Sequence, residues 1–340
     1  MNRADIASKI GTVLIIFATT YLTTLTSYLM LRTLFGNEIG PLALVNNFAL
    51  LTLLPLPAVL MIALTLRRRW LIYWAASLSL LASIWLTPYY WPKPTVSPTG
   101  QTIRLVTFNN MGWNRPLTHT VAWLHQQDAD IIFLQEIPRR YVEQGAAELK
   151  SRYPYQTGQP IELRYSGTGI FSKLPIHSVE YTATYQRAVV ELEGKLISVY
   201  NVHLTQPTSA SDGSMVQKVL TYNDAGHQAQ VTALLTEIRQ DPHPFIVAGD
   251  FNMSDQSPTY PKVAAVMQDS FLEVGSGLGL TWPLRNWEDR NSIPAWMPPL
   301  LRMDYVWHSP HFRAIQLDVG PWLDSDHLPL YATLEVVDSS

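Results

Sequence analysis

The chain contains no cysteine among its 340 residues. Disulfide bonds, thiolate metal sites and a cysteine nucleophile are therefore excluded. The chain also lacks internal repeats and low-complexity segments. Charged residues are absent from three long stretches in its first quarter, residues 11–31, 41–66 and 70–88. These stretches are candidate membrane spans, because a helix that spans a bilayer must be apolar over most of its length.

Each uncharged stretch reaches roughly the 20 residues that cross a bilayer core. Buried helices of a soluble core are the alternative, but three stretches without one internal charge favour membrane spans. A cleaved signal peptide would explain only the first stretch, which lacks a clear small-residue cleavage site. Pro55 and Pro57 predict a kink in the second span. We expect residues 1–90 to form a membrane anchor with three transmembrane helices, at about 11–31, 41–66 and 70–88.

Basic residues predict the orientation of this anchor. Arg3 and Lys9 precede the first stretch, and three arginines at 67–69 separate the second stretch from the third. Only Arg32 lies between the first two stretches, and only Lys93 closely follows the third. The positive-inside rule places the N-terminus and the triple-arginine turn in the cytoplasm. With three spans in the cytoplasmic membrane, everything after residue 90 is extracytoplasmic. If any one of the spans did not cross, the residues after 90 would instead be cytoplasmic.

The charge of the chain is unevenly divided. Residues 1–92 hold six of the 24 Lys and Arg and two of the 27 Asp and Glu, so the remaining residues hold 18 basic and 25 acidic side chains, a net charge of −7. Non-specific binding of nucleic acid comes mainly from cationic contacts to phosphates. An acidic domain therefore disfavours nucleic acid as a partner, although a local basic patch would permit it.

The sequence changes character after the third stretch. Aromatic residues typical of a membrane interface lead into a Pro-rich linker at 91–101. Residues 102–340 then alternate short apolar runs with amphipathic segments, which predicts an α/β domain of sheets covered by helices. The expected strands lie at 103–110, 130–136, 167–173, 195–204, 245–252, 303–309 and 328–337. The expected helices lie at 118–127, 139–150, 224–240 and 259–268.

Most of these strands have, at or beside one end, a residue that can bind a metal or transfer a proton. The residues are Asn109, Glu136, His203, Asp250, Asn252, Asp304, Asp326 and His327. Sites tend to form where strands meet the loops beyond them. Each residue alone has a simpler explanation, such as a turn, a surface strand end, a buried histidine or, for Asp304, a partner for Arg302.

The stretch FIVAGDFN at 245–252 is the hardest to explain by structure alone. Residues two apart on an extended strand share a face, so we expect Asp250 and Asn252 to point one way while Phe251 packs on the other side. Burying that polar pair without a ligand is costly. The candidate set is rich in oxygen donors and has no His-x-x-x-His or thiolate pattern, which argues against structural zinc. It suits Mg²⁺ or Mn²⁺, and hence phosphoester chemistry.

Seven motifs in order, TFNN, IIFLQE, GTGIFSK, YNVHL, VAGDFN, RMDYVWHS and SDHLPL, resemble the endonuclease/exonuclease/phosphatase superfamily. That superfamily includes DNase I, apurinic endonucleases, inositol polyphosphate 5-phosphatases and neutral sphingomyelinases. The resemblance covers about residues 102–337. It implies a DNase I-like fold, a four-layer αββα sandwich in which two mainly antiparallel sheets pack face to face between helices.

The resemblance also implies a role for each candidate residue. It makes Glu136 the main metal-binding carboxylate, with Asn109 beside it and Asp326 in the metal and water network. It makes Asp250 the residue that orients or deprotonates the attacking water, and Asn252 a ligand of water or phosphate. Asp304 would pair with His327, and His203 matches the DNase I and sphingomyelinase branches. Arg187 matches a phosphate-contacting arginine of some members less closely, and Glu162 is a guess for the partner of His203.

These inferences predict a membrane-anchored hydrolase that uses Mg²⁺ or Mn²⁺ to cleave phosphoester bonds. The loop at 281–302 contains three Trp and four Pro, which predicts either a cap over the sheet or an apolar rim for a lipid tail. The layout of three spans and one such domain resembles bacterial membrane proteins associated with glycopeptide resistance, which implies a lipid-linked phosphate, pyrophosphate or phosphodiester as substrate. An extracytoplasmic nuclease and a non-catalytic membrane-tethered binding module are the alternatives.

Overall fold

The computed structural model describes residues 3–94, 97–111, 118–137, 146–158, 167–209, 214–284, 294 and 296–337. The chain divides into two compact units. The first unit consists of Met1–Trp91 together with two short later segments, Ser209–Tyr222 and Gln256–Pro258. The second unit consists of Pro92–Thr208, Asn223–Asp255 and Thr259–Ser340. We call them the helical unit and the sandwich unit.

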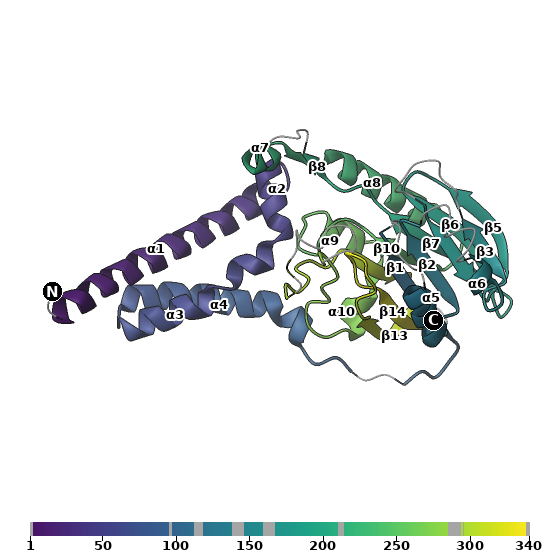
Figure 1. Ribbon diagram of the computed structural model, residues 1–340, viewed down its shortest axis with the longest axis horizontal. Coiled ribbons are helices and arrows are strands. Elements are labelled where there is room, and N and C mark those ends of the chain that lie inside the picture. Colours follow the sequence, from purple (N-terminus) through teal and green to yellow (C-terminus); the bar gives the residue numbers. More distant parts are fainter. Residues whose placement is uncertain are drawn as a thin grey trace. The chain divides into compact units, whose positions relative to one another are not determined.

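The helical unit is built from α-helices and one 3₁₀ helix, η1. Its elements are α1 (Arg3–Phe35), α2 (Gly40–Asn47), η1 (Ala49–Leu53), α3 (Leu56–Thr65), α4 (Arg69–Tyr90) and the short α7 (Met215–Leu220). Helices α1, α3 and α4 lie side by side (Figure 1). Among the described residues, Asp5–Phe35 and Arg69–Tyr90 are long and apolar enough to cross a membrane. A third candidate is the pair Gly40–Asn47 and Ala49–Thr65, which is bent by 75°.

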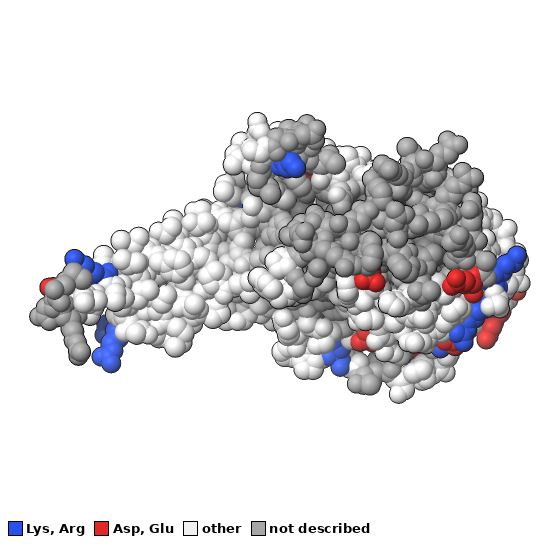
Figure 2. Space-filling view, in the orientation of Figure 1, with Lys and Arg blue, Asp and Glu red and all other residues white. Residues whose placement is uncertain are grey.

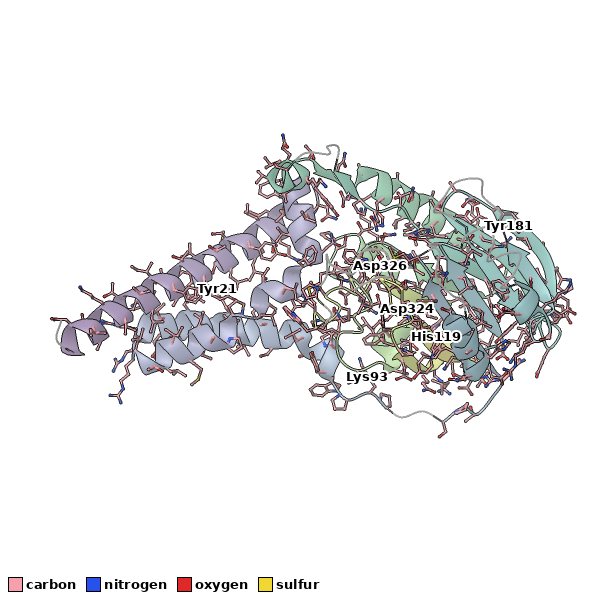
Figure 3. The ribbon with its side chains drawn as sticks, in the orientation of Figure 1. Tyr21, Lys93, His119, Tyr181, Asp324 and Asp326 are labelled. Carbon is pink, nitrogen blue, oxygen red and sulfur yellow. The ribbon has the colours of Figure 1, made fainter. Side chains whose placement is uncertain are left out.

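The chain between residues 40 and 66 runs antiparallel to α1 in spite of that bend. Along the two segments, Tyr28 bonds to Asn46 and Tyr21 to Thr52, and a Cβ atom at Gly11 would lie 3.8 Å from Leu66. Tyr21 is labelled on α1 in Figure 3. Helix α4 then runs parallel to α1, because the Trp74 indole donates to Thr26 and Arg32 lies over the ring of Trp85. The helical unit thus has its three long segments in alternating directions.

The sandwich unit contains two six-stranded sheets. The order in one sheet is β13-β14-β1-β2-β4-β3, where the strands are β1 (Thr102–Asn109), β2 (Ile131–Gln135), β3 (Tyr155–Gly158), β4 (Gly169–Ser172), β13 (Phe312–Val319) and β14 (Leu330–Val336). The order in the other is β11-β12-β10-β7-β6-β5, where the strands are β5 (Ile176–Tyr181), β6 (Tyr185–Leu192), β7 (Lys195–His203), β10 (Phe245–Asp250), β11 (Gln268–Asp269) and β12 (Asp304–His308). A separate two-stranded sheet pairs β8 (Thr208–Ser209) with β9 (Tyr222–Asn223), at the two points where the chain passes from one unit to the other.

Three apolar clusters show that the sandwich unit has four layers. One cluster lies between the two large sheets and includes Phe133 of β2 and Val199 of β7. A second joins the first sheet to α5 (Thr118–Gln127) and α6 (Ala146–Lys150). A third joins the other sheet to α8 (Ala225–Gln240) and α9 (Tyr260–Ala264), while α10 (Ser270–Val274) packs beside β12 and β13. The four-layer α/β sandwich expected from the sequence is therefore confirmed, and its helices and sheets can be followed in Figure 1.

Both large sheets have a parallel pair of strands at their centre. Strand β1 pairs in parallel with β2, and β7 with β10. Strands β14 and β12 flank these pairs in the antiparallel direction. The carboxyl ends of the central strands and the amino ends of β12 and β14 therefore meet at one edge of the sandwich. All seven strands expected from the sequence are present, with ends that differ by up to two residues.

Candidate active site

Along the central strands, every second side chain points into the space between the two sheets. These inward-facing side chains are apolar in the middle of the sandwich and polar at the strand ends. In β10, Ile246 and Ala248 pack between the sheets, and Asp250 is the next residue on that face. By the same alternation, Asn109 in β1, His203 in β7 and Asp304 in β12 lie on the inward face of their strands. These four side chains arrive at the edge because they continue the inward face of their strands.

Glu136 reaches the same place through an irregular backbone. It directly follows β2 and has a φ of 51°, in the left-handed region that non-glycine residues seldom adopt. The preceding Gln135 occupies the inward face of the strand and bonds to Thr107 and Asn201 beneath the site. The turn after Gln135 is what brings the next side chain to the edge. Such backbone conformations persist where the surrounding structure holds them.

A glycine permits the close approach of the two strands that carry Asp250 and His203. Gly249 has a φ of 142°, and a Cβ atom at this position would lie 2.0 Å from the carbonyl oxygen of Val202. Any other residue would therefore push β10 away from β7. The glycine in the motif VAGDFN thus has a local physical reason, independent of any ligand.

The carboxamide of Asn109 joins two acidic side chains. Its Nδ2 donates to Oε1 of Glu136 at 3.1 Å and to Oδ2 of Asp250 at 3.0 Å. Nε2 of His203 lies 3.4 Å from Oε1 of Glu136 and 3.9 Å from Oδ2 of Asp250. Glu136 is therefore the acidic neighbour of His203, the partner that the sequence could not identify. The guess for that partner, Glu162, lies outside the described residues.

His327 lies between two further carboxylates. Its Nδ1 is 2.8 Å from Oδ2 of Asp304, and its Nε2 is 3.7 Å from Oδ2 of Asp250. The alternative partner proposed for Asp304, Arg302, instead forms ion pairs with Asp269 at 2.8 Å and Asp255 at 3.3 Å. Asp304 is therefore left to orient the imidazole of His327 rather than to neutralise an arginine.

Burial and charge shift the pKa values of these groups. Burial raises the pKa of Asp250 to about 6, against the influence of His327 and His203. Burial alone would lower the pKa of His327, but Asp304 and Asp250 outweigh it and raise this pKa well above its ordinary value. His203 shows the same balance with Glu136 as its main partner, so its pKa is raised. The site therefore pairs a carboxylate that can take up a proton near neutral pH with imidazoles held in the charged form.

Asn252 reaches Asp250 in a different way from that expected. Strand β10 ends at Asp250, and Asn252 has a φ of 47°, so the two residues do not share one pleated face. Instead, the backbone N–H of Asn252 donates to Oδ1 of Asp250 at 2.8 Å, and its Nδ2 donates to Oδ2 at 3.1 Å. The expectation for Phe251 holds, because this residue packs against Tyr305 and Trp307 in the cluster beside α8.

Asp326 is positioned by a residue that the sequence did not single out. The indole Nε1 of Trp282 lies 3.3 Å from Oδ2 of Asp326, and its ring centroid is 6.4 Å from that of His327. Burial raises the pKa of Asp326; the residue is labelled in Figure 3. The tryptophan-rich composition of 281–302 was the available signal, although residues 285–293 and 295 of that loop lie outside the described part.

Arg187 is the one described candidate that does not join this group. It lies in β6 opposite Tyr200, and its Nε donates to Oδ2 of the fully buried Asp241 at 2.8 Å. Its other nitrogens contact Glu180 and Ser198. Asp241 precedes β10, whereas Asp250 ends it, so the Arg187 network belongs to the opposite end of that strand.

The arrangement of acids fits a divalent cation. Asp250, Asp304 and His327 have oxygen and nitrogen atoms within 4.8 Å of one another. Because a charged imidazole cannot bind a cation, the two carboxylates are the cation-binding part of this group. Oδ1 of Asp304 and Oδ1 of Asn252 are buried without a hydrogen-bond partner, which leaves two oxygens available to a water or a cation. Glu136, a fifth exposed, adds a carboxylate whose pKa is lowered, because its bonds to His203 and Asn109 outweigh burial. Oxygen-rich sites of this kind suit Mg²⁺ or Mn²⁺.

The comparisons with known proteins place this geometry in a family. The model of the Endonuclease/Exonuclease/phosphatase family matches residues 106–327, which is more than half of the chain. Among curated protein sequences, none matches the chain. The fold resembles that of an endonuclease/exonuclease/phosphatase from Bacteroides vulgatus, with a TM-score of 0.51 at 16% identity over 70% of this chain and 100% of the other.

Two TDP2 structures have the same fold. D. rerio TDP2 complexed with single strand DNA product has a TM-score of 0.53 at 18% identity, over 69% of this chain and 100% of the other. TDP2 from C. elegans has a TM-score of 0.53 at 17% identity, over 71% of this chain and 77% of the other.

Proposed function

Because the chain belongs to the Endonuclease/Exonuclease/phosphatase family, we propose that it is a divalent-metal-dependent phosphoester hydrolase anchored in a membrane. The single observation that carries this proposal is the convergence of Glu136, Asp250 and Asp304 with two imidazoles at one edge of the sandwich. We further propose that its substrate is a lipid-linked phosphate, pyrophosphate or phosphodiester.

The side chains have separable roles in such a reaction. Glu136 and Asn109 would hold the metal, and Asp326 would belong to the metal and water network. A bound Mg²⁺ supplies a Lewis acid that polarises a phosphoryl oxygen and offsets developing negative charge. Asp250, with its pKa raised to about 6, accepts the proton of the attacking water while Asn252 orients that water. The new bond joins the water oxygen to phosphorus, and the bond to the leaving oxygen breaks.

The two imidazoles would act on the phosphate itself. His327 stays charged beside Asp304 and donates a hydrogen bond to a non-bridging oxygen, where negative charge grows in the transition state. His203 stays charged beside Glu136 and can do the same from the opposite side, or protonate the leaving oxygen. Neither role requires a covalent intermediate, so water attacks phosphorus directly.

The order of contacts in the helical unit supports three passes through a membrane. Segment 40–66 runs antiparallel to α1, and α4 runs parallel to it, as three membrane passes require. Basic residues 67–69 then lie at the same end as Lys9, while Phe35 and Tyr90 lie at the other. The exposed face of α1, α3 and α4 in Figure 2 is white along most of its length and carries blue side chains near the N-terminus. We propose that this basic end is cytoplasmic and that the sandwich unit is extracytoplasmic.

Charge and anchoring together favour a lipid substrate. The net charge of −7 after residue 92, which follows from the composition, opposes long anionic polymers but not a single phosphate group held by a metal. A membrane anchor keeps the site near lipid headgroups at high local concentration. The chemistry shared by the candidate substrates is a phosphoryl group attached to an apolar tail.

An extracytoplasmic nuclease is the second candidate. It is favoured by the fold shared with D. rerio TDP2, whose structure is a complex with single strand DNA product. A non-catalytic membrane-tethered module is the third, but it has no need for the complete set of acids and imidazoles found here. A substrate panel separates the three.

The test uses the full chain reconstituted in nanodiscs and stripped of metal with a chelator. Lipid phosphates, lipid pyrophosphates, lipid phosphodiesters, single-stranded DNA and plasmid DNA are offered with and without added Mg²⁺ or Mn²⁺. We expect metal-dependent release of phosphate or phosphorylated headgroup from one lipid class. Asp250→Asn and His327→Ala should abolish it, whereas Asp318→Asn, in β13, should not. Efficient cleavage of DNA with every lipid untouched would overturn the lipid substrate, and full activity in both site variants would overturn the site.

A further inference from the structure

Helix α7 belongs to the helical unit although it lies far from the other helices in sequence. It follows β8 and precedes β9, and it packs against α2. The contact is close, because a Cβ atom on Gly40 would lie 1.9 Å from the carbonyl oxygen of Tyr222. The hydroxyl of Tyr222 also accepts a hydrogen bond from Nδ2 of Asn47 at 3.4 Å. Helix α7 and Tyr222 are therefore closely packed against α2.

The sequence defines α7 as a helix and leaves an apolar face on it uncovered. Ser214 caps its first turn in a capping box with Gln217. Val216 and Leu220, four residues apart and hence on one face of the helix, are 68% and 66% exposed. Lys218 is two residues from each of them, so the helical period places it on the opposite side of the helix. An apolar face with a basic residue opposite is the pattern of helices that lie in a membrane interface.

The position of α7 within the helical unit corresponds to a membrane interface. The unit ends there in Leu34 and Ile39, which are 69% and 42% exposed, and in Trp91, which is 68% exposed. The end of α1 and the end of α4 lie at the same level, because Arg32 and Tyr89 both bond to Gln256. Exposed aromatic residues at a helix end, here Trp91 and the 60% exposed Tyr90, are typical of the headgroup region. Helix α7 packs against α2, which begins directly after Ile39 at this end of the unit.

We propose that α7 is an interfacial anchor, with Val216 and Leu220 seated at the boundary between lipid headgroups and acyl chains. This inference rests on the proposed membrane anchoring of α1 to α4.

The test uses the absence of native cysteine, since a single introduced cysteine carries the only label. Val216→Cys and Leu220→Cys are made in the full chain, labelled with an environment-sensitive fluorophore and reconstituted in phosphatidylcholine and phosphatidylglycerol vesicles. Lys218→Cys is the control on the same helix, and Leu196→Cys in β7 is the control in the sandwich unit. Lipids with quenchers at two depths report how far each label enters the bilayer.

We expect blue-shifted emission and strong quenching at 216 and 220, at a depth of roughly 5–10 Å into the headgroup and acyl boundary. Labels at 218 and 196 should remain in water and be quenched weakly. Equal, weak quenching at all four positions would overturn the anchor, including the case in which a protein partner covers α7. This measurement needs no turnover, so it fails or succeeds independently of the proposed hydrolase activity.

Discussion

The imidazole of His327 is fixed by Asp304, whose Oδ2 lies 2.8 Å from Nδ1 in a position where both side chains are almost fully buried. The two residues come from different elements, Asp304 from the start of β12 and His327 from the loop before β14. Because the opposite ring nitrogen faces Asp250 at 3.7 Å, the imidazole connects the two carboxylates across the site. Its charge state therefore controls the electrostatics on both sides.

Asp304→Asn should lower activity by removing the charge that holds His327 protonated. The pKa of His327 falls in this variant, so less of the imidazole is charged at neutral pH. We expect kcat to fall by about 10²–10⁴-fold near pH 7.5 and to recover partly at lower pH. The measurement is kcat against pH for the wild type and the variant. An unshifted pH profile would show that Asp304 does not govern the charge of His327.

Arg187→Met should destabilise the chain without weakening substrate binding. The guanidinium forms two hydrogen bonds with Asp241, whose buried carboxylate would lose its opposite charge and keep only the hydrogen bonds from Ser198, Tyr200 and the backbone of His243. Loss of one partner of such a pair typically costs about 3–5 kcal/mol. We expect a lower melting midpoint in detergent and an unchanged KM for the folded fraction. Arg187→Lys keeps the charge but loses the paired geometry, so its melting midpoint should lie between those of the wild type and Arg187→Met.

A raised KM with an unchanged melting midpoint in Arg187→Met would contradict a purely structural role for Arg187. It would support the substrate-contacting role that the sequence resemblance implied for this residue. The measurement thus separates a structural ion pair from a phosphate ligand.

The central strands were predicted from the sequence because a strand that is buried on both faces consists of a continuous run of apolar residues. β2 and β10 are buried along their whole length, and both appear in the expected places. Strand β5 has an exposed face, with only two of its residues partly buried, and its pattern resembles that of a loop. β13 was likewise not predicted. β6 was not predicted although it is mostly buried, because Gln186 and Arg187 interrupt its apolar run. Local pattern therefore identifies the central strands and misses those nearer the sheet edges.

The composition of the site is predictable, but its pairings are not. His203 meets Glu136 because β7 faces β2 across the sandwich, and no local pattern encodes which strands face each other. The relation between Asp250 and Asn252 depends on a positive φ that the extended pattern does not reveal. Helix α7, which begins after the capping residue Ser214, was not predicted, and no local pattern indicates that it belongs to the helical unit.

Lowering the pH should destabilise the chain partly through His227. This residue is 3% exposed, and its Nε2 lies 2.7 Å from the carbonyl oxygen of Phe251, next to the site. Burial lowers its pKa, so the folded state favours neutral imidazole while the unfolded chain binds a proton below about pH 6.5. The contribution of His227 to stability is therefore present above that pH and is lost progressively as the pH falls toward the folded pKa.

His227→Gln keeps a donor for the Phe251 carbonyl and cannot titrate. We expect the difference in melting midpoint between pH 7.5 and pH 5 to be smaller in this variant than in the wild type. Measuring both proteins at both pH values cancels the other acids that titrate in this range. An equal loss in the two proteins would assign the pH dependence to groups other than His227.

Arg32→Ala should weaken the helical unit at the point where it holds segment 256–258. Nη2 of Arg32 donates to the carbonyl oxygen of Gln256 at 2.6 Å, and its guanidinium lies over the ring of Trp85 at 5.2 Å. A hydrogen bond from a charged donor is worth about 1.5–3 kcal/mol, so a measurable fall in melting midpoint is expected. Arg68→Ala, which removes an arginine from the opposite end of the helices, is the matched control. If the two variants melt alike, the contact with Gln256 does not stabilise the helical unit.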